Sequence, residues 1–134
     1  MKHLLIVIAI LISTLAAKAQ DTDNVKKVLE TGVEVYTKLK EPPTYVKGAK
    51  AFYDFLGSSI RMPAEVRENG LRGTAVVTFI VEEDGTLSGY KILSSPSNAM
   101  GEEVIRVMKT SAKWNPGKVD GKPVKFLFNL PVSF

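Results

Sequence analysis

Cysteine is missing from the chain, and histidine occurs only once, as His3. The absence of cysteine excludes a disulfide framework, a thiol nucleophile and a thiolate zinc site. The lone histidine excludes histidine metal clusters and serine–histidine–aspartate triads. The carboxylates of Glu82, Glu83 and Asp84 precede a glycine, so we interpret them as a solvated turn rather than an acid–base pair or a cation site. We therefore expect no enzymatic activity, no cofactor and no bound metal.

Long hydrophobic runs are also missing, apart from one near the N-terminus. Residues 4–12 are apolar without interruption, after a short basic start. A small-x-small pattern ends at Ala19, so we expect a signal peptide over residues 1–19 that is cleaved between Ala19 and Gln20. As a helix, residues 4–17 would span roughly 21 Å, which is short of the ~30 Å hydrocarbon core of a bilayer. A retained inner-membrane anchor is the alternative.

Neither sign of charge is in large excess. The chain has 18 lysines and arginines, 14 acidic residues and a net charge of +4. Loss of residues 1–19 removes Lys2 and Lys18, which leaves a net charge of +2. Such a small charge gives little support for nucleic-acid binding. At 134 residues the chain has the size of one domain, and we expect a periplasmic protein that touches the membrane only through an uncleaved N-terminus.

After the signal peptide we distinguish a leader over residues 20–41 and one domain over residues 42–134. In the leader, Val25, Val28 and Leu29 suit either a short helix or a loose segment, and residues 33–36 alternate as a short extended piece. The domain begins with a predicted helix whose apolar face has the spacing i, i+3, i+4 and i+7. That face comprises Ala49, Phe52, Tyr53 and Leu56.

The rest of the domain alternates between strands and a helix. Residues 73–82 are apolar on both faces, which predicts a central strand, and a hairpin turn at Asp84-Gly85 leads to a more polar edge strand over residues 87–94. An apolar helical stripe then includes Met100 and Met108, Trp114 is expected in the core, and the alternation of residues 124–134 predicts a long strand. The predicted fold class is α+β, a three-stranded antiparallel sheet with helices packed on one face.

The last strand contains a proline that suits an exposed edge. Proline has no backbone N–H, so Pro131 is tolerated where this group would face solvent. Backbone groups of alternate residues share one side of a strand, so those of residues 125, 127 and 129 would also face outward and could pair with an incoming strand. The alternative is that Pro131 only protects the edge against aggregation. The candidate partner-binding edge comprises Lys125, Phe126, Leu127, Phe128, Asn129 and Leu130.

A series of short motifs runs from Met62 to the end of the chain. The motifs are Gly70-Leu71-Arg72-Gly73, Val77-x-Phe79, Asp84-Gly85, Ile92-Leu93-Ser94-Ser95, Trp114-x-Pro116-Gly117-Lys118, Gly121-Lys122-Pro123-Val124 and Leu130-Pro131-Val132-x-Phe134. In this order and spacing they resemble the C-terminal domain of TonB, the energy transducer of Gram-negative envelopes. A weaker similarity to Bacteroidetes TonB-like proteins covers Tyr45-Val46-Lys47-Gly48 and residues 52–56.

The resemblance implies a domain that recruits an extended segment, the TonB box, of an outer-membrane TonB-dependent receptor by strand addition at the last strand. It also implies a link to transmembrane transport. Full-length members of the family have an N-terminal membrane helix and a proline-rich spacer, whereas only a short stretch without such a spacer precedes Pro42 here. The alternatives are a self-associating accessory envelope protein, for example a homodimer, and a short membrane-anchored energy transducer.

Overall fold

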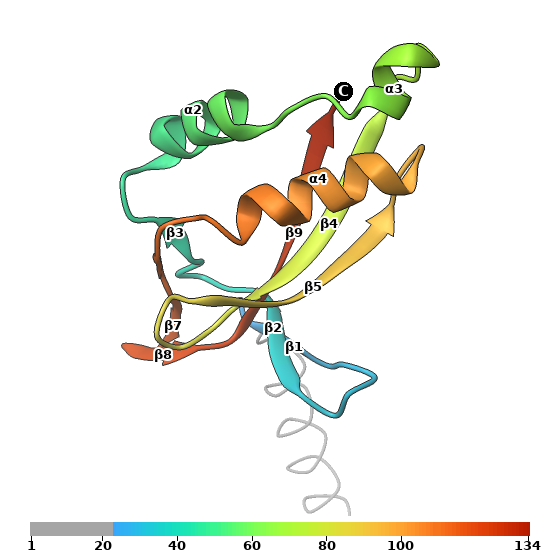
Figure 1. The fold of residues 1–134 in the computed structure, drawn as a ribbon. Coiled ribbons are helices and arrows are strands. Elements are labelled where there is room, and N and C mark those ends of the chain that lie inside the picture. The colour runs from blue at the N-terminus through green and yellow to red at the C-terminus, as the bar shows by residue number, and fades with distance from the viewer. Residues whose placement is uncertain (1–22) are drawn as a thin grey trace, which may run out of the picture.

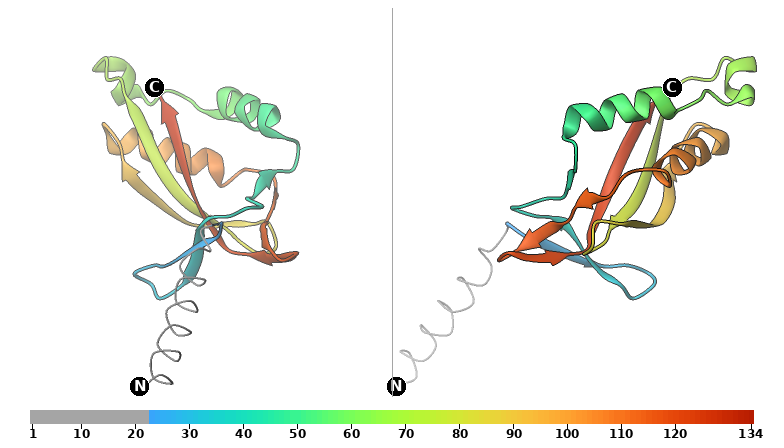
Figure 2. Two further views of the ribbon diagram at one scale, coloured as in Figure 1. Left: turned by 180° about the vertical axis from the view of Figure 1, so that it is seen from behind. Right: turned by 60° about the vertical axis from the view of Figure 1, so that its left-hand side comes forward.

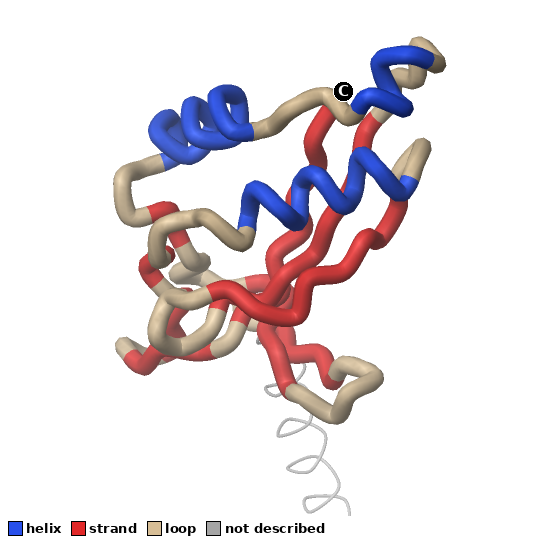
Figure 3. Tube along the Cα trace, viewed as in Figure 1, coloured by secondary structure: helices blue, strands red, loops and turns tan. Residues whose placement is uncertain are grey.

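The computed structural model describes residues 23–134, so the expected signal peptide and its cleavage point lie outside the described residues. Figures 1 and 3 show the arrangement of the helices and strands. In chain order they are β1 (Val25–Val28), β2 (Glu34–Lys38), β3 (Thr44–Tyr45), α2 (Ala49–Ser59), α3 (Ala64–Glu68), β4 (Thr74–Val81), β5 (Leu87–Ser94), α4 (Asn98–Met108), β6 (Trp114–Asn115), β7 (Gly117–Val119), β8 (Lys122–Val124) and β9 (Phe126–Ser133). In the described part of the chain, α2, α3 and α4 all lack the length and hydrophobicity of a membrane-spanning helix.

The main sheet is built around β4, which is the strand predicted to be central. The strand order is β1-β2-β9-β4-β5, so β4 has a partner on each side and β5 lies at an edge (Figure 1). β4 is antiparallel to both β5 and β9. Between Ala75 and Val81 every residue except Val76 is buried, because the apolar side chains of both faces are shielded in the middle of the sheet. The predictions of a central and an edge strand are confirmed.

The sheet has five strands and is mixed, so the prediction of a three-stranded antiparallel sheet is wrong in this respect. The two additional strands come from the leader. β1 forms where a short helix or a loose segment was considered, and β2 forms where a short extended piece was expected. Together they make an antiparallel hairpin. β2 then joins β9 in parallel at Tyr36 and Phe126. The side chain of Val35 is only 1% exposed, so burial of apolar surface provides a physical reason for the docking of this hairpin.

Helix α4 packs against β4 and β5, as Figure 1 and the rear view in Figure 2 show. The hydroxyl oxygen of Ser97 accepts a hydrogen bond from the backbone N–H of Met100 at 3.3 Å, and thereby caps the start of α4. Met100 and Met108 are fully buried, and Trp114 is buried with them in one hydrophobic core. The predicted roles of these three residues and the α+β class are confirmed.

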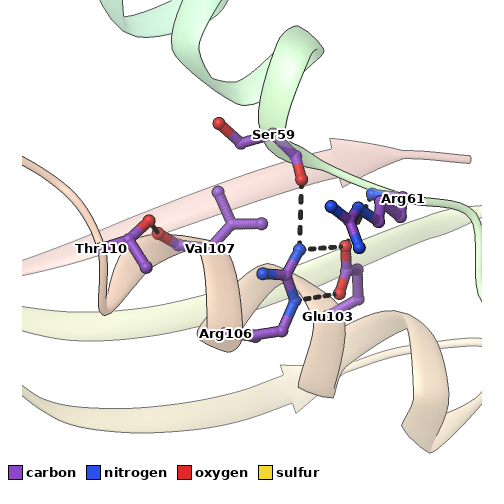
Figure 4. Close-up of polar contacts among 6 residues, drawn as sticks. All are labelled: Ser59, Arg61, Glu103, Arg106, Val107 and Thr110. Carbon is purple, nitrogen blue, oxygen red and sulfur yellow. Dashed lines mark hydrogen bonds and ion pairs between the residues drawn. The ribbon is translucent and has the colours of Figure 1, made fainter.

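Polar contacts tie α4 to the C-terminal end of α2 (Figure 4). Arg106 donates to the Glu103 carboxylate from Nε at 2.6 Å and from Nη2 at 2.9 Å, and Nη2 also donates to the carbonyl of Ser59 at 3.1 Å. The backbone N–H of Arg61 donates to Glu103 Oε2 at 2.6 Å. The hydrogen bond from Arg106 holds the pKa of Glu103 below its ordinary value. The end of α2 is therefore fixed against α4.

Candidate functional site

The outer side of β9 follows from its hydrogen bonding to β4. Gly73 and Phe134 exchange both backbone hydrogen bonds, at 2.8 and 3.4 Å, so they form a hydrogen-bonded pair of this antiparallel ladder. Along an antiparallel ladder, hydrogen-bonded pairs alternate with pairs that are not hydrogen-bonded, and the register between β4 and β9 is unbroken. Pro131 lies three residues before Phe134, so it occupies a position that is not hydrogen-bonded to β4. The backbone groups of Asn129 and Ser133, two residues away on either side, face the same outer side as the missing N–H of Pro131.

β2 covers only the beginning of this outer side. Its one bridge to β9 joins Tyr36 to Phe126, and the backbone N–H of Tyr36 donates to the carbonyl of Lys125 at 2.8 Å. Among the described residues, no strand pairs with β9 on this side after Phe126. The uncovered edge, by which we mean the outer side of residues 129–133, is thus free of protein partners in this part of the chain.

The six residues of the sequence-predicted edge have different positions in the structure. The backbone groups of Phe126, Phe128 and Leu130 belong to the ladder with β4. Lys125 and Leu127 flank the bridge to β2, and Lys125 Nζ also lies 3.6 Å from the Glu82 carboxylate. Asn129 is the member of the six whose outward backbone groups lie beyond β2. Sequence periodicity alone could not show that the leader would cover the first part of the edge.

An apolar groove of about 330 Å³ lies beside the uncovered edge. Residues of α2 and β3 line it on one side and residues of β9 on the other. The ring of Trp114 belongs to this lining, with its centroid 5.0 Å from Phe52, 5.3 Å from Phe128 and 5.7 Å from Tyr45. The lining includes no charged residue and comprises Pro43, Thr44, Tyr45, Ala49, Phe52, Tyr53, Trp114, Phe128, Asn129, Leu130 and Pro131.

The predicted apolar face of helix α2 contains both buried core residues and exposed residues. Phe52 and Leu56 are buried in the core, whereas Ala49 is exposed and Tyr53 is 68% exposed. Ala49 and Tyr53 are four residues apart, so they are neighbours on the helix surface, and both line the groove. Sequence analysis missed them as site residues because helical spacing does not distinguish a core position from the rim of a groove.

A second hollow, of about 470 Å³, lies at the β1–β2 hairpin and has a different character. Charged residues of both signs line it, among them Lys26, Glu34 and Glu83. Its lining includes Val124 and Lys125, which precede β9, and no residue of the uncovered edge. The mixed charges and the distance from the free backbone groups leave the apolar groove as the better candidate site.

The carboxylates considered in the sequence lie at the β4–β5 hairpin, as predicted. The carboxylate of Asp84 accepts hydrogen bonds from the Thr86 hydroxyl at 2.6 Å and from its backbone N–H at 3.0 Å. These bonds, chiefly the one from the hydroxyl, hold the pKa of Asp84 below its ordinary value. Asp84 therefore stabilises a turn, which accounts for its carboxylate without a catalytic role.

Comparisons with known proteins identify the family of this chain. No curated protein matches the chain. A family model described as "Gram-negative bacterial TonB protein C-terminal" matches residues 59–134, from the end of α2 to the last residue. The matched region contains β4, β5, α4 and β9, and so the strand that bears the uncovered edge. Because this match covers more than half of the sequence, the chain belongs to the family of TonB C-terminal domains.

Proposed function

We propose that this domain binds an extended TonB-box segment of an outer-membrane receptor by adding it as a strand to the uncovered edge of β9. The observation that carries the proposal is the register between β4 and β9, which turns the backbone groups of Asn129 and Ser133 outward. They have no strand partner there among the described residues, and Pro131 lies between them on the same side. Unpaired backbone groups at a sheet edge are a template for an incoming strand. The main-chain hydrogen bonds would supply affinity.

Membership of the family supports interaction with outer-membrane receptors in general. TonB C-terminal domains are binding and transduction domains of the Gram-negative envelope that interact with outer-membrane receptors, and they are not a known enzyme family. The specific proposal of strand addition at residues 129–133 rests on the geometry of the edge. Relative to the edge expected over residues 125–130, the proposed site is displaced toward the C-terminus, because β2 already lies against Lys125.

NMR titration of the isotope-labelled full chain with TonB-box peptides tests this proposal. We expect chemical-shift changes concentrated on residues 127–133. Asn129→Pro removes one outward N–H that is not part of the ladder with β4, so this variant should fold and lose most of its affinity. Asn129→Ala keeps the N–H and is the matched control, for which we expect binding close to that of the unaltered chain. Equal affinity of the proline variant would overturn strand addition at this edge.

Self-association through the same edge is the competing proposal. A homodimer would protect the amides of Asn129 and Ser133 from hydrogen exchange without any peptide, and sedimentation would give twice the mass of one chain. A monomer with rapidly exchanging amides at these two positions would exclude it.

Energy coupling by a membrane-anchored form is a separate proposal, which requires an intact N-terminus on membrane-bound protein. Gln20 as the first residue of the mature protein would contradict that form.

A further inference from the structure

We infer that the apolar groove is a side-chain pocket that selects a neutral aromatic or large aliphatic residue at one position of the bound peptide. The inference rests on the proposed function, because the groove and the uncovered edge share residues of β9. Asn129 and Pro131 belong to both. A strand that paired with this edge would therefore run along the mouth of the groove.

Strand geometry determines which peptide residues reach the groove. Neighbouring strands lie about 4.8 Å apart, and side chains alternate between the two faces of a sheet. The side chains of Phe128 and Leu130 point to the face that carries the core and α2. A peptide residue beside either of them would point to the same face, and its neighbours in the peptide would point away. One or two peptide positions can therefore enter the groove.

The chemistry of the lining defines the residue that fits. No lining residue is charged, and four aromatic rings surround the space: Tyr45, Phe52, Trp114 and Phe128. An ionised side chain would lose its hydration there without finding an opposite charge, which is strongly unfavourable. An aromatic or branched aliphatic side chain would bury apolar surface against the rings. The exposed ring of Tyr53 stands at the rim, where it can close over the bound residue.

The peptide is favoured over a free small molecule because the site combines two features. The groove provides apolar surface, and the edge beside it provides backbone donors and acceptors at the two-residue spacing of a strand. A small apolar ligand would use the first feature and leave the second unused. An extended segment with one large neutral side chain would use both.

Fluorescence titration with a peptide series tests the inference. Trp114 is the only tryptophan of the chain and lines the groove, so its emission reports on occupancy. Starting from a TonB-box peptide that binds the full chain, each residue is replaced in turn by Phe, Ala and Asp. We expect one position at which Asp in place of Phe weakens binding roughly tenfold to a hundredfold, in line with the burial of one large apolar side chain.

Two variants on the protein side provide a matched pair. Ala49 is the exposed first residue of α2 and lines the groove, whereas Ala64 is the exposed first residue of α3 and does not. Ala49→Phe fills the groove while retaining a single tryptophan. It should weaken the peptide with Phe at the selected position and leave the Ala peptide unchanged. Ala64→Phe should affect neither peptide.

The outcomes separate this inference from the proposed function. If peptides bind and Asn129→Pro abolishes binding, yet no position prefers a large neutral residue and Ala49→Phe has no effect, the side-chain pocket is wrong and strand addition stands. If no peptide binds the unaltered chain at all, the proposed function is wrong and the inference falls with it. A preference for Phe that Ala49→Phe removes would support both.

Discussion

The carbonyl oxygen of Gly85 accepts a hydrogen bond from the backbone N–H of Trp114 at 2.8 Å. This bond joins the β4–β5 hairpin turn to the segment that follows α4, although the two residues are far apart in the sequence. It holds the backbone of Trp114 while the indole ring packs among Phe52, Phe79 and Phe128. The position of Trp114 in the groove lining therefore depends on the turn that follows the C-terminal end of β4.

Gly85→Ala should destabilise the protein through this contact. Gly85 has φ of +85°, and a Cβ there would overlap the carbonyl oxygen of Trp114. Gly32 has φ of +84° with open space around it, so Gly32→Ala is the control for the cost of the backbone conformation alone, about 1–2 kcal/mol. Chemical denaturation should show a clearly larger loss for Gly85→Ala. Equal losses would show that the contact with Trp114 relaxes easily.

Met100→Ala should lower the free energy of unfolding by about 2–5 kcal/mol, because Met100 is fully buried between α4 and the sheet. Met62 is 46% exposed, so Met62→Ala removes the same side chain outside the core and should cost less than about 1 kcal/mol. Urea denaturation of the two variants measures the difference. Similar costs would contradict the packing described for α4.

The pair of Glu103 and Arg106 makes stability depend on pH in the acid range. The pKa of Glu103 is lowered in the folded chain, so its stabilising contribution is complete above the ordinary glutamate pKa of about 4.3 and is lost as the pH falls through the lower folded value. Glu103→Gln should cost about 1–2 kcal/mol at pH 7 and flatten the loss of stability below about pH 4.3. Thermal unfolding from pH 2.5 to 7 measures both effects. A variant with the slope of the unaltered chain would assign the acid sensitivity to other carboxylates.

Tyr36→Pro should release the β1–β2 hairpin without unfolding the domain. The substitution removes the N–H that bonds to the carbonyl of Lys125, at the only bridge between β2 and β9. Hydrogen exchange should then accelerate over residues 25–38 while β4 stays protected. Tyr36→Phe keeps the N–H and is the control. If strand addition occurs at β9, peptide-induced shifts in the proline variant should also extend toward Lys125.

Particular residues show how far sequence reasoning reached. The burial of Met100 and Met108 and the central position of β4 were predictable from apolar periodicity, which indicates the side chains that leave water. The burial of Trp114 was predictable because large aromatic side chains usually pack in the core. The leader was less predictable. Its strands are short, and β1 has four exposed residues, so their pairing depends on partners rather than on local pattern.

The candidate site shows the same division. Proline at position 131 could be assigned to an edge from the sequence, since a residue without an N–H fits poorly within a ladder. The strand that lies against Lys125 could not be predicted in this way, because β2 lies about ninety residues earlier in the chain. The docking of β2 decides how much of the edge stays uncovered.

The family, the α+β class, the order α2, β4, β5, α4 and β9, and the last strand as the one that bears the edge were all predictable from the sequence. The family follows from the order and spacing of its motifs. The other features depend on local periodicity, turn residues and proline chemistry, which act over a few neighbours. The mixed sheet and the groove that Ala49 and Tyr53 line beside Asn129 became visible only once the chain was seen folded. Such features arise when segments distant in sequence compete for the same apolar surface and the same backbone groups. Local sequence patterns do not predict which segment will occupy them.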